Sequence, residues 1–95
     1  MDVNDRLQEL MRLTFSEIRE MPESSTLDVV DEEGKKCQLV TWREQVGPES
    51  CRVVVSLHRV RSLGFSSLHS ARGFSISSNG TIEMLEPAEA EKLFS

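Results

Sequence analysis

The chain has 95 residues, of which 38% are hydrophobic and 28% charged, and its formal net charge is −5. This length provides for one domain with one hydrophobic core, which buries roughly 60–65% of the surface of the unfolded chain. The acidic balance disfavours non-specific binding of nucleic acid or of a membrane surface by the chain as a whole.

The N-terminal segment MDVNDRLQEL has neither the basic start nor the apolar run of a secretory signal peptide. No apolar run approaches the roughly 18 residues that a membrane span needs. We therefore expect a cytoplasmic protein without membrane association. Cys37 and Cys51 lie in strand-like segments and are expected to stay reduced as buried thiols.

Residues 3–21 are predicted to form one long amphipathic helix. Its apolar stripe, at 100° per residue, collects Val3, Leu7, Leu10, Met11, Thr14, Phe15, Ile18 and Met21. Leu13 lies off this stripe. Asp2 or Asn4 can cap the start of the helix, and Pro22 disfavours helical geometry at the residue before it, which ends the helix there.

From Ser25 to Glu86 the pattern is typical of β-strands punctuated by glycine. Strands are expected at about 25–31, 35–46, 51–61, 65–77 and 81–86, separated by the turns DEEG, GPES, RSLG and SSNG. Pro87 opens a short C-terminal helix over 87–94, since proline suits the first helical position. The predicted fold class is α+β, with the N-terminal helix packed on one face of a five-stranded antiparallel meander.

The turns also predict how the strands pair. A four-residue turn sequence with glycine in the fourth position suits a type I turn followed by a left-handed glycine. The pairs expected from this rule are Val29–Cys37, Leu27–Leu39, His58–Leu68, Val60–Ser66, Ile76–Ile82 and Phe74–Met84. For GPES we expect a four-residue loop, which sets Val46 opposite Cys51 and therefore Trp42 opposite Val55.

This register sorts the strand residues into two faces. The face expected under the N-terminal helix collects Leu27, Val29, Cys37, Leu39, Val54, His58, Val60, Leu68, Phe74, Ile76, Ile82 and Met84. The other face collects Val30, Val40, Trp42, Val46, Cys51, Val53, Val55, Leu57 and Ala71. One helix cannot cover both faces, so the face around Trp42 needs a second cover.

The predicted function follows from that uncovered face. We expect a small non-catalytic protein-interaction module that forms a homodimer, because a contiguous apolar patch is rare on a monomer. The candidate interface residues are Val40, Trp42, Val53, Val55, Leu57 and His69. The C-terminal helix or an unidentified protein partner is the alternative cover.

A second hypothesis uses the basic segment of the chain. No acidic residue occurs from Ser50 to Ile82, where Arg59, Arg61 and Arg72 could contact an anionic ligand, an acidic partner or nucleic acid. The nucleic-acid signature is weak, since the segment has no lysine cluster and little aromatic content.

No motif predicts an enzyme, a metal or another cofactor. Cys37, Cys51, His58 and His69 have the side chains of a zinc site, but the expected register places the two cysteines near opposite ends of the sheet and on different faces. The same separation opposes a disulfide. The glycines fit turns rather than a phosphate-binding loop, and no serine lies in a nucleophile-elbow sequence.

Overall fold

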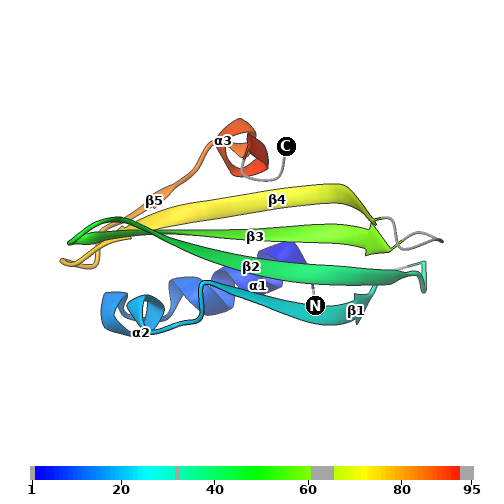
Figure 1. Ribbon diagram of the computed structural model, residues 1–95, viewed down its shortest axis with the longest axis horizontal. Coiled ribbons are helices and arrows are strands. Elements are labelled where there is room, and N and C mark those ends of the chain that lie inside the picture. Colours follow the sequence, from blue (N-terminus) through cyan, green and yellow to red (C-terminus); the bar gives the residue numbers. More distant parts are fainter. Residues whose placement is uncertain (1, 32, 61–65, 93–95) are drawn as a thin grey trace.

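The computed structural model describes residues 2–31, 33–60 and 66–92, and it gives the side chains of these residues except for 60, 66–69, 87, 91 and 92. Five strands form one antiparallel sheet in the order β1-β2-β3-β4-β5. In Figure 1, helices α1 and α2 lie behind and below this sheet and α3 lies above it. The bounds are α1 Val3–Met11, α2 Phe15–Arg19, β1 Ser24–Val30, β2 Lys36–Gly47, β3 Ser50–Val60, β4 Ser66–Ser77, β5 Ile82–Met84 and α3 Pro87–Lys92. The predicted α+β meander is confirmed.

The N-terminal helical segment is two helices rather than the single long helix predicted. α1 begins at a capping box, in which the Asp2 carboxylate accepts a hydrogen bond from the N–H three residues later. Thr14 has an extended backbone and forms a second capping box, because its hydroxyl accepts from the N–H of Glu17 and the Glu17 carboxylate accepts from the N–H of Thr14. This Thr-x-x-Glu pattern restarts the helix. The break allows Leu13 to pack against the core.

The glycine turns within the described residues have the expected geometry. Gly34 and Gly80 have φ angles of 79° and 89°, a left-handed conformation that glycine adopts without steric cost. The RSLG turn lies outside the described residues. The pairs that the turn rule predicts are all present, namely Val29–Cys37, Leu27–Leu39, His58–Leu68, Val60–Ser66, Ile76–Ile82 and Phe74–Met84.

The register between β2 and β3 differs by one residue from the prediction, which set Val46 opposite Cys51. The structure instead pairs Gln45 with Cys51. The ladder then continues to Gly47 and Ser50, which flank a two-residue turn, so Val46 is the extra residue of a β-bulge. Because side chains alternate between the faces of a sheet, this shift moves each described β3 side chain to the face opposite the one predicted.

The helix face, the face of the sheet on which α1 and α2 pack, carries the main hydrophobic core. Its buried residues are Leu39, Cys51, Val53, Val55, Phe74 and Ile76 from the strands and Val3, Leu7, Leu10 and Ile18 from the helices. Full burial of one large apolar side chain contributes about 1.5–3 kcal/mol. The contact between helices and sheet is therefore the main source of stability.

The second face, opposite the helix face, is covered over β3 and β4 by α3. Ala90 of α3 is fully buried and packs against Val54 and Ala71, with Leu85 beside them. Gly73 lies beside this contact and has no room for a side chain, because a Cβ there would lie 2.5 Å from the backbone carbonyl oxygen of Val53 and 3.0 Å from the side chains of Leu85 and Val54. The C-terminal helix therefore covers part of this face, which is one of the alternatives that the sequence left open.

The β3 shift corrects the predicted faces. The residues that lie on the face opposite the predicted one are Cys51, Val53, Val54, Val55, Leu57 and His58. Cys37 and Cys51 thus share the helix face, and the prediction of different faces for them is wrong. Both are free, buried thiols, and they pair with Arg59 and Gln45 at opposite ends of the sheet.

We predict that Phe74→Ala lowers the free energy of unfolding by about 3–5 kcal/mol, because it leaves a cavity beneath the helices. Met84 provides the matched control, since it pairs with Phe74 on β5 but is 54% exposed. Met84→Ala should cost less than about 1 kcal/mol. Urea denaturation of both variants measures the difference, and equal small losses would show that Phe74 does not lie in the core.

Candidate functional site

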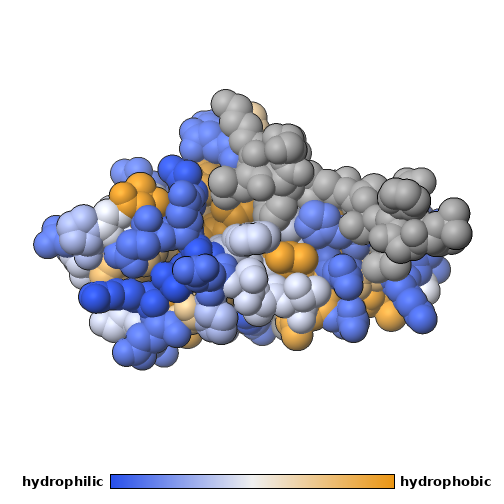
Figure 2. Space-filling view, in the orientation of Figure 1, coloured by the Kyte–Doolittle hydropathy of each residue, from blue (hydrophilic) through white to orange (hydrophobic). Residues whose placement is uncertain are grey.

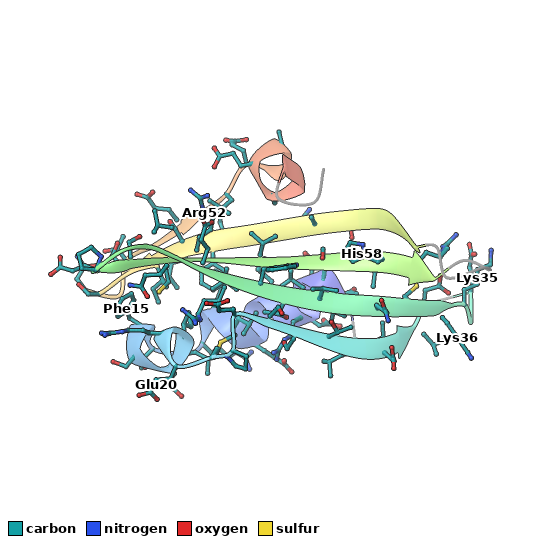
Figure 3. The ribbon with its side chains drawn as sticks, in the orientation of Figure 1. Phe15, Glu20, Lys35, Lys36, Arg52 and His58 are labelled. Atoms are coloured by element: carbon teal, nitrogen blue, oxygen red, sulfur yellow. The ribbon has the colours of Figure 1, made fainter. Side chains whose placement is uncertain are left out.

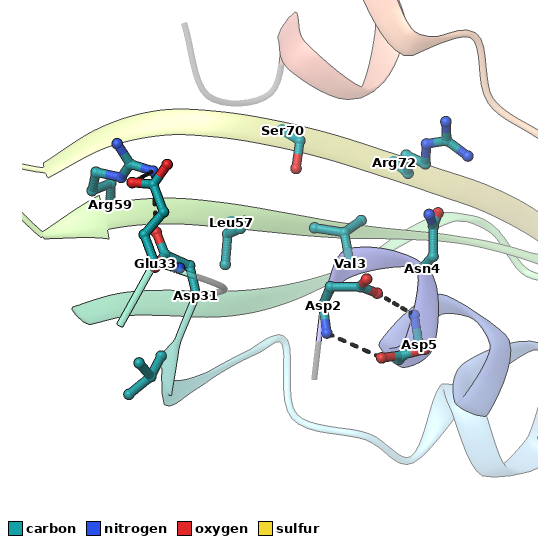
Figure 4. Close-up of a pocket in the computed structure, with 11 residues that line it drawn as sticks. Asp2, Val3, Asn4, Asp5, Asp31, Glu33, Leu57, Arg59, Ser70 and Arg72 are labelled. Atoms are coloured by element: carbon teal, nitrogen blue, oxygen red, sulfur yellow. Dashed lines mark hydrogen bonds and ion pairs between the residues drawn. The ribbon is translucent and has the colours of Figure 1, made fainter. Parts of the chain in front are cut away.

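A groove of about 670 Å³ opens on the helix face between the start of α1 and the β1–β2 hairpin (Figure 4). The strands continue past the start of α1 to this hairpin, where Figure 3 shows Lys35 and Lys36. The groove is lined by Asp2, Val3, Asn4, Asp5, Val30, Asp31, Glu33, Leu57, Arg59, Ser70 and Arg72. Two of the three arginines predicted to contact an anion, Arg59 and Arg72, therefore line one groove.

Asp31 organises the hairpin end of the groove. Its carboxylate accepts hydrogen bonds from the backbone N–H groups of Glu33 at 2.9 Å and Lys35 at 2.8 Å. It also forms an ion pair with Arg59, with 3.1 Å between Oδ2 and Nη2. The Lys35 N–H above all, with the other two donors, holds the pKa of the Asp31 carboxyl below its ordinary value. The ionised Asp31 side chain thus stabilises the β1–β2 hairpin.

The charges around the groove give little support to an anionic ligand. Arg59 is already paired with the hairpin carboxylates, and Asp2 and Asp5 stand at the start of α1. Arg72 is exposed and forms no ion pair with another described residue. The acidic side chains of the lining outnumber the arginines, so they oppose an added negative charge. Arg61, the third predicted contact, lies outside the described residues.

The predicted interface residues are divided between the two faces. Val40 and Trp42 lie on the second face, where Trp42 is 45% exposed. Val53 and Val55 are fully buried beneath the helices, and Leu57 lines the groove. The prediction that these residues form one continuous patch is wrong, because the bulge in β2 changes the register of β3.

Ser56 and His58 form a contact that the sequence analysis missed. Ser56 Oγ lies 2.8 Å from Nε2 of His58, which is on β3 toward the hairpin end (Figure 3). Burial lowers the pKa of His58 and favours its neutral form. A serine beside an imidazole is the arrangement of an activated nucleophile, but Ser56 is 0% exposed, so a substrate cannot reach its hydroxyl. The side chain of His69 lies outside the described residues.

Three exposed apolar side chains lie on β1 and the adjacent part of β2. Val30 is 62% exposed, and Leu27 and Trp42 are each 45% exposed. Trp42 pairs with Ser24, the first residue of β1. Seen from the second face, separate apolar spots show in the centre of the molecule and along its lower margin, where β1 lies in Figure 1, with hydrophilic surface around them (Figure 2). Apolar side chains are therefore exposed on both faces of the sheet beside β1, Leu27 on the helix face and Val30 and Trp42 on the second face.

We predict that Asp31→Asn lowers the free energy of unfolding at pH 7, because the amide cannot replace the charged acceptor of three donors. The folded pKa of Asp31 is lowered, so its charge stabilises the fold above the unfolded pKa, and that contribution disappears as the pH falls through the folded pKa. Denaturant titrations should therefore show a gap between variant and wild type that closes in acid. Asp28→Asn, an exposed change on β1, is the control and should show no such gap; a constant gap for Asp31→Asn would contradict the assignment.

Comparison of the chain with protein-family models, with curated proteins and with solved structures finds no match. Among the described residues, no group of three or more His, Cys, Asp or Glu side chains is placed to hold a metal ion. No described helix is long and apolar enough to span a membrane. The geometry of the described surface is therefore the basis for a functional proposal.

Proposed function

We propose that this protein is a small non-catalytic protein-interaction module that binds a second copy of itself. The observation that carries the proposal is the exposure of apolar side chains on both faces of the sheet beside β1, with Leu27 on the helix face and Val30 and Trp42 on the second face. A long sheet edge flanked by exposed apolar side chains is a ready template for pairing with another chain. The proposed contact is centred on β1, rather than on the middle of the second face, because α3 covers that middle.

A non-catalytic role is supported by the state of the reactive side chains. The thiols of Cys37 and Cys51 and the hydroxyl of Ser56 are all buried. The Asp31 carboxylate is held by the hairpin backbone and by Arg59. An active site needs a nucleophile or an acid–base group that a substrate can reach, and these groups serve the fold instead. The free thiols also support our proposal that the protein works in the reducing cytoplasm.

A second copy is the partner that the surface favours. In a two-fold dimer the same patch meets itself, so each exposed apolar residue is covered without any need for a complementary surface elsewhere. Val30 and Trp42 are large and apolar, whereas the residue of β1 next to Trp42 is the small Ser24. Ser24 and Val30 are the two ends of β1, so an antiparallel second copy brings a large side chain beside a small one at each end. Binding of a different protein is the alternative, and it predicts that this chain alone remains monomeric in the test below.

We predict that sedimentation equilibrium finds twice the 10.7 kDa chain mass at micromolar concentrations. Trp42→Glu should shift the equilibrium toward the monomer, because it places a charge within the apolar contact. Val46→Glu is the matched control: Val46 is also exposed, at 51%, but lies on the bulge at the far end of β2. Circular dichroism confirms that both variants are folded. A wild-type chain that remains monomeric throughout the micromolar range would refute self-association.

A further inference from the structure

We infer that the second copy binds edge to edge along β1, so that the two five-stranded sheets join into one continuous antiparallel sheet. This inference rests on the proposed self-association and identifies the surface that performs it. β1 stands at the end of the strand order and pairs with β2 alone among the described strands (Figure 1). Most of its residues are exposed. The whole strand is thus available as a template for another strand.

The backbone groups that β1 turns outward can be assigned from the hydrogen bonds at its two ends. The Asp31 N–H donates to the Lys35 carbonyl, and the Arg43 N–H donates to the Glu23 carbonyl. Residues that are bonded to a given neighbour alternate along an antiparallel ladder, so the odd-numbered residues of β1 bond to β2. The residues whose N–H and C=O groups face the free edge are then Ser24, Thr26, Asp28 and Val30.

β1 lacks the features by which proteins usually prevent pairing at a sheet edge. Its register with β2 runs from Ser24 to Val30 without a bulge. The strand contains no proline and no lysine, and Asp28 is its one charged residue. The opposite edge differs, since β5 has three residues and α3 packs on β4 beside it. The β1 edge is therefore the one suited to a second copy.

Two-fold symmetry selects one register for the new pair of strands. A two-fold axis that passes between Leu27 and its own copy pairs all seven residues of β1 with those of the second copy. An axis at Asp28 would set two carboxylates directly opposite each other, which is destabilising. An axis at Thr26 would set Val30 against Pro22, which has no N–H to donate. The geometry therefore favours the axis at Leu27.

The side chains match across this junction on both faces. On the helix face, Leu27 meets its own copy at a non-hydrogen-bonded pair, where side chains approach most closely. Leu39 is the partner of Leu27 within each chain, so a continuous row of leucines crosses the junction. On the second face, Ser24 meets Val30 of the second copy, and Trp42 lies beside Ser24. The indole can then extend over the small serine to that valine.

Cysteine cross-linking tests the register. Paired Cα atoms at a non-hydrogen-bonded position are about 4.5 Å apart, which a disulfide can bridge. We expect Leu27→Cys to give a disulfide-linked dimer under mild oxidation. Ser25→Cys is the matched control, because its copy lies four residues along the strand, roughly 13 Å away at ~3.3–3.4 Å per residue. Cys37 and Cys51 are buried, so they do not compete.

A backbone variant gives a second, independent readout. Thr26→Pro removes an outward N–H and leaves the bonds to β2 intact, so we expect the dimer to dissociate about tenfold more readily or worse while the chain stays folded. Thr26→Val keeps the N–H and the branched side chain and should dimerise like the wild type. Sedimentation equilibrium and circular dichroism measure association and folding separately.

The outcomes distinguish this inference from the proposed function. A cross-link at position 27 but not at 25, together with a weakened Thr26→Pro dimer, supports edge pairing in the stated register. If the protein is a dimer but Leu27→Cys gives no cross-link, or Thr26→Pro does not weaken the dimer, edge pairing is wrong. The proposed self-association then holds through another surface. A wild-type monomer overturns both, including the case in which the same edge pairs only with a strand of another protein.

Discussion

The burial of one row of β3 side chains beneath α1 and α2 determines most of the remaining structure. With Cys51, Val53 and Val55 on the helix face, the alternate residues of β3 necessarily face the other side. That row includes Val54 and the small Ser56, and the helix that covers it contributes the small Ala90. The sheet therefore has a large hydrophobic core under α1 and α2 and a smaller one under α3. The sizes of the two cores follow from which β3 residues face α1 and α2.

The unequal lengths of helices and strands decide which surfaces remain open. α1 has nine residues and is about 13–14 Å long, whereas the 12 residues of β2 extend over roughly 40 Å. The helices cannot cover the sheet as far as the β1–β2 hairpin, and the groove beside Asp31 occupies the remainder. Asp31 stabilises this hairpin from within, through the backbone of Lys35 and the guanidinium of Arg59. The edge of β1 has no partner among the described strands for a different reason, since β1 is the first strand of the meander.

Local sequence patterns predicted the features that depend on one short segment. The apolar stripe predicted the helical face, and Gly34 and Gly80 predicted their turns and the pairs beside them. The Thr14-x-x-Glu17 capping box was a readable signal that the predicted single helix would break. The leading aspartate of DEEG was another, because an aspartate there often accepts hydrogen bonds from its own turn. Asp31 could therefore have been recognised from the sequence as the centre of the hairpin.

The register of β3 could not be derived in the same way. GPES is compatible with a four-residue loop and with a two-residue turn beside a bulge, and the two differ by one residue. Val53, Val54 and Val55 are consecutive valines, so the strand presents an apolar row to either face and its own pattern cannot choose. The choice comes from packing against the helices. The predicted interface around Trp42 depended on that choice, and Val53, Val55 and Leu57 lie on the opposite face from Trp42.

The sheet buries its centre but leaves the β1 edge without a partner strand in the part of the chain that the structure describes, and the proposed role depends on that edge. Hydrogen exchange along β1, followed by NMR at increasing protein concentration, tests this most directly. The amides of Leu27 and Val29 bond to β2 and should exchange slowly at every concentration. The amides of Thr26 and Asp28 should exchange rapidly when the protein is dilute and slow together as the dimer forms. If those two amides exchange rapidly at concentrations where the protein is dimeric, the β1 edge is not the contact.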